Sequence, residues 1–372
     1  MSDVSDAAGE KPVVEHAEFE RLTTLVSAEF QIEESLMEQG IPTYYLKQPQ
    51  ETKQAFLKLL KSIDPLGLMA ILRRQNGRIV LRVFSKPPIK PSNVMINWVL
   101  FFATIATTFI TGYLLSGEGM EPLVGGVTFT IAIMTVLGMH ELGHKITANR
   151  KGVDATPPYF IPGPPPMQGL LGIGTFGAVI MQKSLPPNKD SLFDIGASGP
   201  ILSFLLSIVA TSIGLYFSPI KYTSEELSTL PVPLLFLLIS EAVVPPVTPP
   251  PGQYAYILLH PVAFAGWVGM LVTMLNLLPA AMLDGGHVSR SLFGERTRLV
   301  LTVLSIISLF LVSPIMALFV LFMAFYKHPG PLDDVSSLTT GRKLLAVGLV
   351  AILVLCSWLY YLVFYLLGFL GF

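Results

Sequence analysis

The sequence predicts a mainly α-helical, multi-pass membrane protein with a small soluble α/β domain at its N-terminus. Two observations lead to this fold class. The 372-residue chain is 52% hydrophobic and only 13% charged, whereas soluble domains carry about 25% charged residues. The charge is also unevenly placed, because residues 1–90 hold 24 of the 49 charged side chains. The remainder of the chain therefore lacks the polar surface of a soluble fold.

The N-terminal part is predicted to comprise two regions. Residues 1–20 are acidic and have no apolar core, so we expect disorder rather than a secretory signal or an Arg-rich transit peptide. Residues 21–90 are predicted to form a soluble cytosolic domain of order α-β-α-β-β. We expect helices over 21–39 and in ETKQAFLKLLKSID, a strand at TYYLK and a hairpin around Asn76-Gly77. Such a domain suits a regulatory or docking role.

Residues 91–372 are predicted to form the transmembrane domain. A helix needs about 20 apolar residues to cross a bilayer. The fifth apolar run is interrupted by Ser313-Pro314 and is either one kinked span or a hairpin, so we expect about six spans. The runs are 96–115, 124–142, 195–217, 261–279, 299–326 and 344–371.

Lys and Arg in short loops predict the orientation, because cytosolic loops carry an excess of positive charge. The loop SGEGMEP after the first span has neither residue. The basic residues gather before the first span, after the second and after the fourth, which places the N-terminal domain and the end of the second span on the cytosolic side. We take the cytoplasmic membrane as the default. The residues are Arg82, Lys86, Lys90, Lys145, Arg150, Lys151, Arg290, Arg296 and Arg298.

The second span ends in HELGH, which puts ionisable groups at membrane depth, where they are costly. His140 and His144 are four residues apart, so on a helix they project to one side and can bind a single Zn²⁺. Glu141 lies between them, where its carboxylate can take a proton from a zinc-bound water. This is the HExxH arrangement of zinc peptidases, in which zinc lowers the pKa of that water toward about 7.

A catalytic zinc usually takes three protein ligands, and Asp284 in LNLLPAAMLDGGHVSR is the best candidate for the third. Pro279 should break the helix before it. Gly285-Gly286 should allow a sharp turn after it. Two alternatives stay open: Asp284 as a helix N-cap, and His287 as the ligand in its place.

Other polar and small residues in the spans suggest supporting roles. Asn276 either orients substrate or makes an interhelical hydrogen bond. Asp194 is expected to be an N-cap and Asp190 to be solvated. Three small residues of the third span should allow close helix approach. They are Gly196, Gly199 and Ser203.

The segment between the second and third spans is rich in Gly and Pro, but apolar at its centre. GIGTFGAVI is expected to form membrane-associated extended strands, with Gly174 and Gly177 at positions of close backbone approach. Irregular backbone is tolerated at membrane depth where protein surrounds it.

HELGH together with NLLPAAMLDGGH, about 140 residues further on, resembles the site-2 protease family of intramembrane zinc metalloproteases. The resemblance covers about residues 95–290, the expected core of the transmembrane domain. It implies that the metal ligands of one catalytic zinc ion are His140, His144 and Asp284. It also implies that Glu141 is the general base and that Asn276 positions substrate. The chain departs from the family at Ser203, where members often have Asn.

The resemblance implies an enzyme that cleaves a peptide bond within or near the transmembrane segment of another protein, as in regulated intramembrane proteolysis. We expect the strand that carries Gly174 and Gly177 to pair with the unwound substrate. The alternatives are a metal-ion transporter or channel that uses the His/Glu/Asp cluster as an ion site, and an inactive scaffold. A net charge of −1 indicates no nucleic-acid partner, and the single Cys356 excludes Cys-based metal sites. No feature specifies an oligomeric state.

Overall fold

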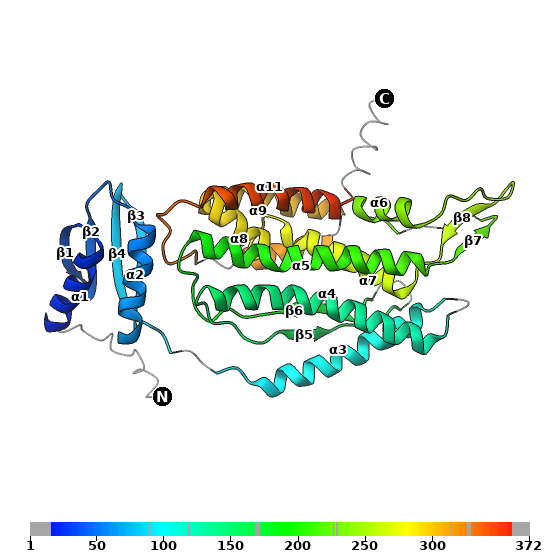
Figure 1. Cartoon of the computed structure of the whole chain (residues 1–372), viewed down its shortest axis with the longest axis horizontal. Coiled ribbons are helices and arrows are strands. Elements are labelled where there is room, and N and C mark those ends of the chain that lie inside the picture. The colour runs from blue at the N-terminus through cyan, green and yellow to red at the C-terminus, as the bar shows by residue number, and fades with distance from the viewer. Residues whose placement is uncertain are drawn as a thin grey trace, which may run out of the picture. The chain divides into compact units, whose positions relative to one another are not determined.

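The computed structural model forms two compact units, which are described separately (Figure 1). The smaller unit contains the chain up to Lys90 together with residues 185–189 and 330–337. The larger unit contains the rest. The structure describes residues 16–88, 91–117, 120–167, 172–225, 227, 230–312, 314–325 and 329–358.

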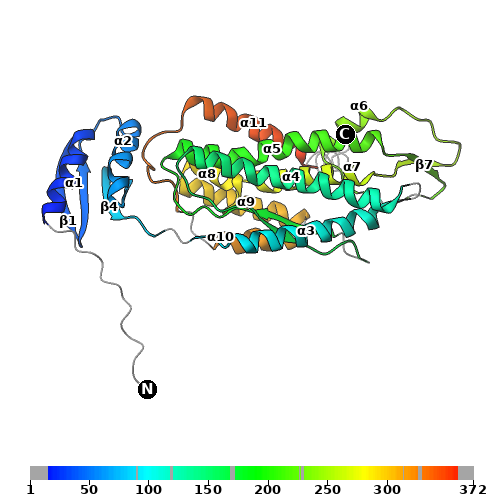
Figure 2. The ribbon, with the colours of Figure 1, turned by 60° about the horizontal axis from the view of Figure 1, so that its bottom comes forward.

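The smaller unit is an α/β fold. Its elements are α1 (His16–Glu29), β1 (Ile32–Glu38), β2 (Ile41–Leu46), α2 (Lys53–Ile63), a 3-10 turn (Asp64–Leu66), β3 (Leu68–Gln75) and β4 (Arg78–Ser85). The strands form one antiparallel sheet in the order β1-β2-β4-β3, and α1 and α2 lie against it (Figure 2). Phe56, Leu59 and Ile63 are buried at helical spacing on α2, so one face of this helix faces the core.

Most of the predicted elements of this unit are confirmed. TYYLK lies in β2, the Phe- and Leu-rich stretch forms α2, and β3 and β4 make the expected hairpin. Asn76 and Gly77 both have positive φ, 48° and 82°, as a two-residue type I′ turn requires.

The predicted helix over 21–39 is wrong in its second half. α1 begins earlier, at His16, and β1 follows it from Ile32. The residues of β1 favour helix individually, but Gln39 and Gly40 adopt φ of 53° and 78°. That turn folds β1 back onto β2, and the cross-strand pairing overrides the local preference.

The exposed edge of β3 is covered by residues 330–337, which lie far away in sequence. The backbone N–H of Leu72 donates to the carbonyl oxygen of Leu332 (2.9 Å), and the N–H of Asp334 donates to that of Leu72 (3.2 Å). This pairing is parallel. It satisfies backbone groups of an edge strand that would otherwise be open to another chain.

Residues 185–189 extend this edge pairing, because they bond in turn to residues 330–337. The N–H of Leu332 donates to the carbonyl oxygen of Pro186 (2.8 Å), and the N–H of Asp333 donates to that of Pro187 (3.0 Å). The smaller unit is thus completed by two segments from later in the chain, which the sequence did not indicate because neither segment has a strand-like pattern.

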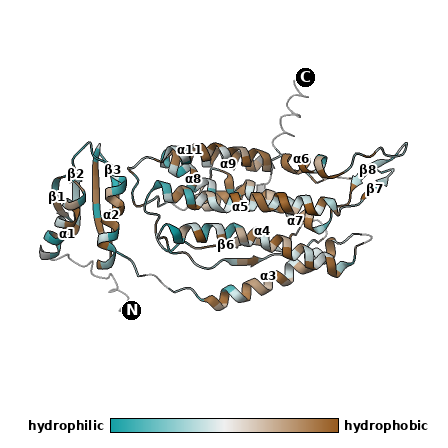
Figure 3. Ribbon diagram, viewed as in Figure 1, coloured by the Kyte–Doolittle hydropathy of each residue, from teal (hydrophilic) through white to brown (hydrophobic). Residues whose placement is uncertain are grey.

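The larger unit is mainly helical. Its elements are α3 (Val94–Leu115), α4 (Pro122–Arg150), β5 (Tyr159–Pro162), β6 (Thr175–Val179), α5 (Lys189–Tyr216), β7 (Ile220–Thr223), α6 (Leu234–Val243), β8 (Tyr254–Ile257), α7 (Pro261–Leu277), α8 (Asp284–Phe293), α9 (Glu295–Val312), α10 (Pro314–Ala324) and α11 (Thr340–Cys356). The hydropathy colouring shows these helices as mostly apolar (Figure 3).

Among the described residues, three helices are long and apolar enough to cross a membrane: α3, α4 and α5. α7 is apolar but has only 17 residues. In the run 299–326, α9 ends at Val312 and α10 begins at Pro314, and Ser313 lies outside the described residues. The second half of the run 344–371 also lies outside them. The total of six spans stays a prediction.

The Gly/Pro-rich segment forms an antiparallel hairpin, β5 with β6, as the expectation of extended strands requires. Packing contacts join this hairpin to α3 and α4. β6 has β5 as its only strand partner within the described residues.

Candidate metal centre

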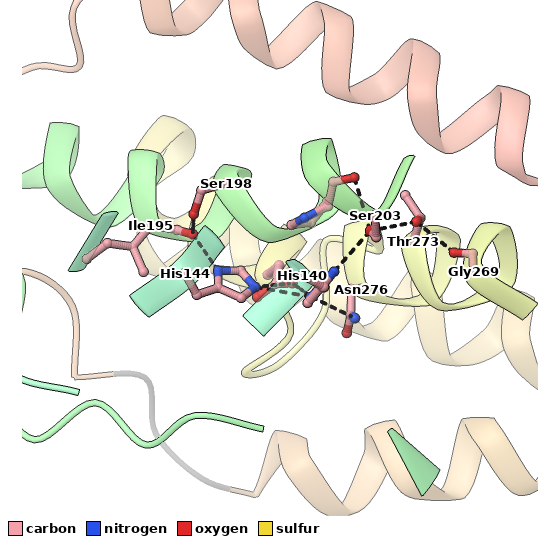
Figure 4. Close-up of polar contacts among 10 residues, drawn as sticks. His140, His144, Ile195, Ser198, Ser203, Gly269, Thr273 and Asn276 are labelled. Atoms are coloured by element: carbon pink, nitrogen blue, oxygen red, sulfur yellow. Dashed lines mark hydrogen bonds and ion pairs between the residues drawn. The ribbon is translucent and has the colours of Figure 1, made fainter. Parts of the chain in front are cut away.

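His140 and His144 lie one turn apart on a buried face of α4. The two residues are 3% and 5% exposed, and their Nε2 atoms are 3.1 Å apart (Figure 4). Gly143, also on α4, faces α5. A Cβ at Gly143 would lie 3.0 Å from the carbonyl oxygen of Ser198 on α5. The absence of a side chain there lets α5 approach, so the two imidazoles are enclosed between packed helices.

Asp284 joins the two histidines from the first residue of α8. Its Oδ2 lies 3.2 Å from Nε2 of His140 and 3.1 Å from Nε2 of His144. α7 ends at Leu277, two residues before Pro279, as the expected helix break predicts. The chain then starts a new helix with the carboxylate directed at the imidazoles.

The role predicted for Gly285-Gly286 is wrong, because both glycines lie inside α8. The chain turns before Asp284, where Ala281 has a φ of 46°. A Cβ on Gly285 would overlap the carbonyl oxygen of Leu277, and one on Gly286 would overlap that of Ala281. The two glycines therefore allow the first turn of α8 to lie against the end of α7.

Neither alternative for this segment matches the geometry. The N-cap of α8 is Leu283, so the side chain of Asp284 has no capping role. Within the described residues, the group of donor atoms able to share a metal ion comprises His140, His144 and Asp284 and does not include His287.

The three donor atoms fit a zinc ion. Their separations of 3.1 to 3.2 Å are nearly equal, and tetrahedral ligands about 2.0–2.1 Å from zinc lie roughly 3.3 Å apart. Nδ1 of His144 lies 2.7 Å from the carbonyl oxygen of Ile195. Since a carbonyl only accepts, Nδ1 carries the hydrogen and a neutral ring directs the Nε2 lone pair into the cluster. Two imidazoles and one carboxylate are also a known ligand set of catalytic zinc.

Gly199 on α5 provides the space for the His144 ring. A Cβ at this position would overlap the imidazole, including Nε2 itself. One turn earlier, a Cβ at Gly196 would lie 2.9 Å from the carbonyl oxygen of Asp284. The small residues of this helix therefore do more than permit close helix packing, because they admit the donor atoms themselves.

Glu141 follows His140 on α4 and is 7% exposed. The backbone N–H of Ile180, the residue after β6, lies close enough to interact electrostatically with its carboxylate. The hairpin expected to accept substrate thus touches the expected general base.

Asn276 also reaches the cluster from α7, with Nδ2 3.3 Å from Nε2 of His140. Gly174 and Gly177 adopt φ of 75° and 102°, but in different surroundings. Gly174 is packed against Thr111 and the backbone of α3, whereas a Cβ at Gly177 would meet nothing within 4 Å.

The roles expected for Asp190 and Asp194 are wrong. Both lie inside α5 and form ion pairs with Arg342 at the start of α11, at 3.2 Å and 2.6 Å. Lys151 also lies 2.7 Å from Asp194. These carboxylates bind helices together rather than cap one.

Sequence reasoning missed the groups that contact the far side of each imidazole. Ser203 Oγ lies 3.0 Å from Nδ1 of His140, and Thr273 Oγ1 lies 2.8 Å from Ser203 Oγ. The only signal in the sequence was that Ser203 is small and stands where the resembled family often has Asn. Thr273 gave none.

Comparisons with known proteins agree with this site. The sequence model of peptidase family M50 matches residues 128–320. The probable zinc metalloprotease EGY1, chloroplastic, of Arabidopsis thaliana is 31% identical over 252 residues, which are 64% of this chain and 44% of the relative. The probable zinc metalloprotease EGY2, chloroplastic, of the same plant is 30% identical over 196 residues, 51% of this chain and 33% of the relative.

A third Arabidopsis thaliana protein, probable zinc metallopeptidase EGY3, chloroplastic, is 28% identical over 225 residues, 55% of this chain and 38% of its own length. The chain thus spans less than half the length of these relatives. No solved structure matches it. The family match covers more than half of the chain and includes both histidines, the glutamate and the aspartate. The chain therefore belongs to peptidase family M50, the site-2 protease family.

Proposed function

We propose that this protein is an intramembrane zinc metalloprotease that hydrolyses a peptide bond within or near the transmembrane segment of a membrane-protein substrate. One observation carries the proposal: three donor atoms lie within about 3.2 Å of one another, and two of them belong to α4, a helix long and apolar enough to cross a bilayer. The names of the relatives, zinc metalloproteases, agree with it.

In this proposal His140, His144 and Asp284 hold one zinc ion. When bound, zinc supplies a Lewis acid for the scissile carbonyl and makes water more acidic. Glu141 accepts the proton of the attacking water and passes it to the leaving amine. The amide of Asn276, whose Nδ2 lies 3.3 Å from Nε2 of His140, donates to the substrate carbonyl and orients it.

The substrate segment has to unwind before cleavage, because a helix hides its backbone in internal hydrogen bonds. The edge of β6 that faces away from β5 has no strand partner among the described residues and is the proposed place for an extended segment of substrate. The contact between Ile180 and Glu141 supports this route, because it puts the end of β6 beside the proposed base.

The proposed orientation of the site in the membrane rests on charge. The Lys and Arg distribution supports a cytosolic side for the N-terminal unit and for the end of α4. The relatives are named chloroplastic, so the cytoplasmic membrane expected from the sequence stays a prediction.

The test is Glu141→Gln in the purified full-length protein, with zinc content and cleavage of a transmembrane peptide measured together. We expect zinc to be retained and cleavage to be lost. Glu121→Gln is the matched control, since Glu121 caps the far end of the same helix and its loss should leave cleavage unchanged. Cleavage at the wild-type rate in Glu141→Gln would refute the role of the base. Metal flux without any cleavage by the wild type would instead support the transporter alternative.

A further inference from the structure

A hydrogen-bond chain of buried hydroxyl groups extends from His140 across α5 to α7 (Figure 4). Nδ1 of His140 lies 3.0 Å from Ser203 Oγ, which lies 2.8 Å from Thr273 Oγ1. Thr273 Oγ1 in turn donates to the carbonyl oxygen of Gly269 at 2.8 Å. Ser203 and Thr273 are 0% exposed, so their hydroxyls are not accessible to bulk water and must find hydrogen-bond partners within the protein.

We infer that Ser203 and Thr273 are positioning residues that hold His140 in the tautomer that binds zinc. The inference rests on the proposed zinc site and adds two residues to it. It also makes Ser203 Oγ the acceptor and Nδ1 of His140 the donor in their hydrogen bond.

The direction follows from counting hydrogens. The carbonyl of Gly269 only accepts, so the single hydroxyl hydrogen of Thr273 is used there. The 2.8 Å contact between the two hydroxyls then needs the hydrogen of Ser203. With that hydrogen spent, Ser203 Oγ can only accept from His140, so Nδ1 must carry a hydrogen.

The second contact of Ser203 does not change this result. Its Oγ also lies 3.2 Å from the carbonyl oxygen of Pro200, which again only accepts. Whether the hydrogen of Ser203 points to Thr273 or to Pro200, none is left for Nδ1 of His140.

A neutral imidazole carries one N–H. With that hydrogen at Nδ1, the lone pair lies on Nε2 of His140, the atom 3.2 Å from Oδ2 of Asp284. His144 reaches the same state differently, through the carbonyl oxygen of Ile195 at 2.7 Å. Only the tautomer of His140 depends on side-chain hydroxyls. A substitution can therefore remove the group that fixes this tautomer without moving the backbone.

Close packing of α5 and α7 makes this hydrogen-bond chain possible. A Cβ at Gly269 would overlap the hydroxyl of Ser207, one turn after Ser203 on α5. The helices therefore approach where glycine allows it, and Thr273, one turn after Gly269, comes within reach of Ser203.

Groups that orient metal-bound histidines typically contribute about 10- to 100-fold to metal affinity. We expect Ser203→Ala to weaken zinc binding within that range. Thr273→Val should weaken it less, because Ser203 can still accept from Nδ1, while its hydrogen is then held only by the longer 3.2 Å contact with the carbonyl oxygen of Pro200. Thr273→Ser restores the hydroxyl and should restore the affinity.

The double variant gives the sharpest result. Thr273 acts through Ser203, so Ser203→Ala with Thr273→Val should bind zinc no more weakly than Ser203→Ala alone. If each substitution weakened zinc binding independently through lost packing, the two losses of binding free energy would add in the double variant.

The experiment is chelator competition for zinc by the full-length protein in nanodiscs. It is accompanied by the Co²⁺ absorption spectrum, which reports the geometry of the site, and by thermal stability without metal. Ser207→Ala and Thr211→Val are the controls. Ser207 is a buried α5 hydroxyl bonded only to the carbonyl oxygen of Ser203, and the hydroxyl of Thr211 has no partner among the described residues.

Wild-type zinc affinity in Ser203→Ala or in Thr273→Val would overturn the inference, and so would equal losses in the two controls. Neither result would affect the proposed protease activity, which is tested by Glu141→Gln. Conversely, a protein that binds zinc with the expected dependence on Ser203 but cleaves no transmembrane peptide would leave the inference intact and refute the proposed function.

Discussion

Nε2 of His144 and Oδ2 of Asp284 lie 3.1 Å apart, although 140 residues separate them in the chain. The contact exists because the end of α7 is broken and α8 starts with the carboxylate, while α4 holds the imidazole in a packed interior. Nothing local holds these two atoms together. Their proximity makes the ligand assignment open to direct tests.

The charge of Asp284 should decide whether zinc binds. Asp284→Asn keeps the shape but removes the negative charge, so we expect loss of bound zinc at equal protein concentration, measured by metal analysis after gel filtration. His287→Asn, one turn further on α8, is the control and should keep its zinc. Zinc retained in Asp284→Asn and lost in His287→Asn would mean that the histidine is the ligand.

Gly199 should tolerate no side chain. In Gly199→Ala the added methyl group would occupy the place of the His144 ring, so the imidazole has to move and the donor triangle opens. We expect loss of zinc and of cleavage, measured by chelator competition and peptide hydrolysis. Gly348→Ala on α11 is the matched control, since a Cβ there meets nothing within 4 Å. Unchanged zinc affinity in Gly199→Ala would contradict the described fit of ring against helix.

The two glycines of the hairpin should respond differently to alanine. At Gly177 the methyl group finds open space but the φ of 102° becomes strained, so the edge of β6 deforms and kcat/KM should fall while zinc is retained. At Gly174 the methyl group also collides with α3, so thermal stability should fall as well. If Gly177→Ala cleaves like the wild type, substrate pairing with β6 is not supported.

Arg342 should contribute to stability by joining α11 to α5. Removing it in Arg342→Met leaves the carboxylates of Asp190 and Asp194 largely buried without their shared cation, at a cost on the order of 1–3 kcal/mol. Lys86→Met is the comparison, since the pair of Lys86 with Asp64 is exposed and should be worth less than about 1 kcal/mol. Thermal unfolding of both variants in detergent measures the difference, and equal stability of the two would show that the α5–α11 ion pairs contribute no more than the exposed pair.

The local parts of the protein were predictable from sequence because short-range geometry determines them. The spacing of His140 and His144 on a helix fixes their common face, whatever the rest of the chain does. Asn76-Gly77 specifies its hairpin through the φ values that only such residues adopt readily. The apolar runs of α3, α4 and α5 indicate a membrane by length alone.

Only the tertiary structure decided the remainder, because it depends on which distant segments meet. The residues of β1 favour helix until β2 lies beside them, and residues 330–337 resemble a loop until the edge of β3 pairs with them. Ser203 and Thr273 are ordinary small polar residues in sequence. Their proposed role arises because α5 and α7 pack closely at Gly269, which directs two hydroxyls toward one imidazole nitrogen.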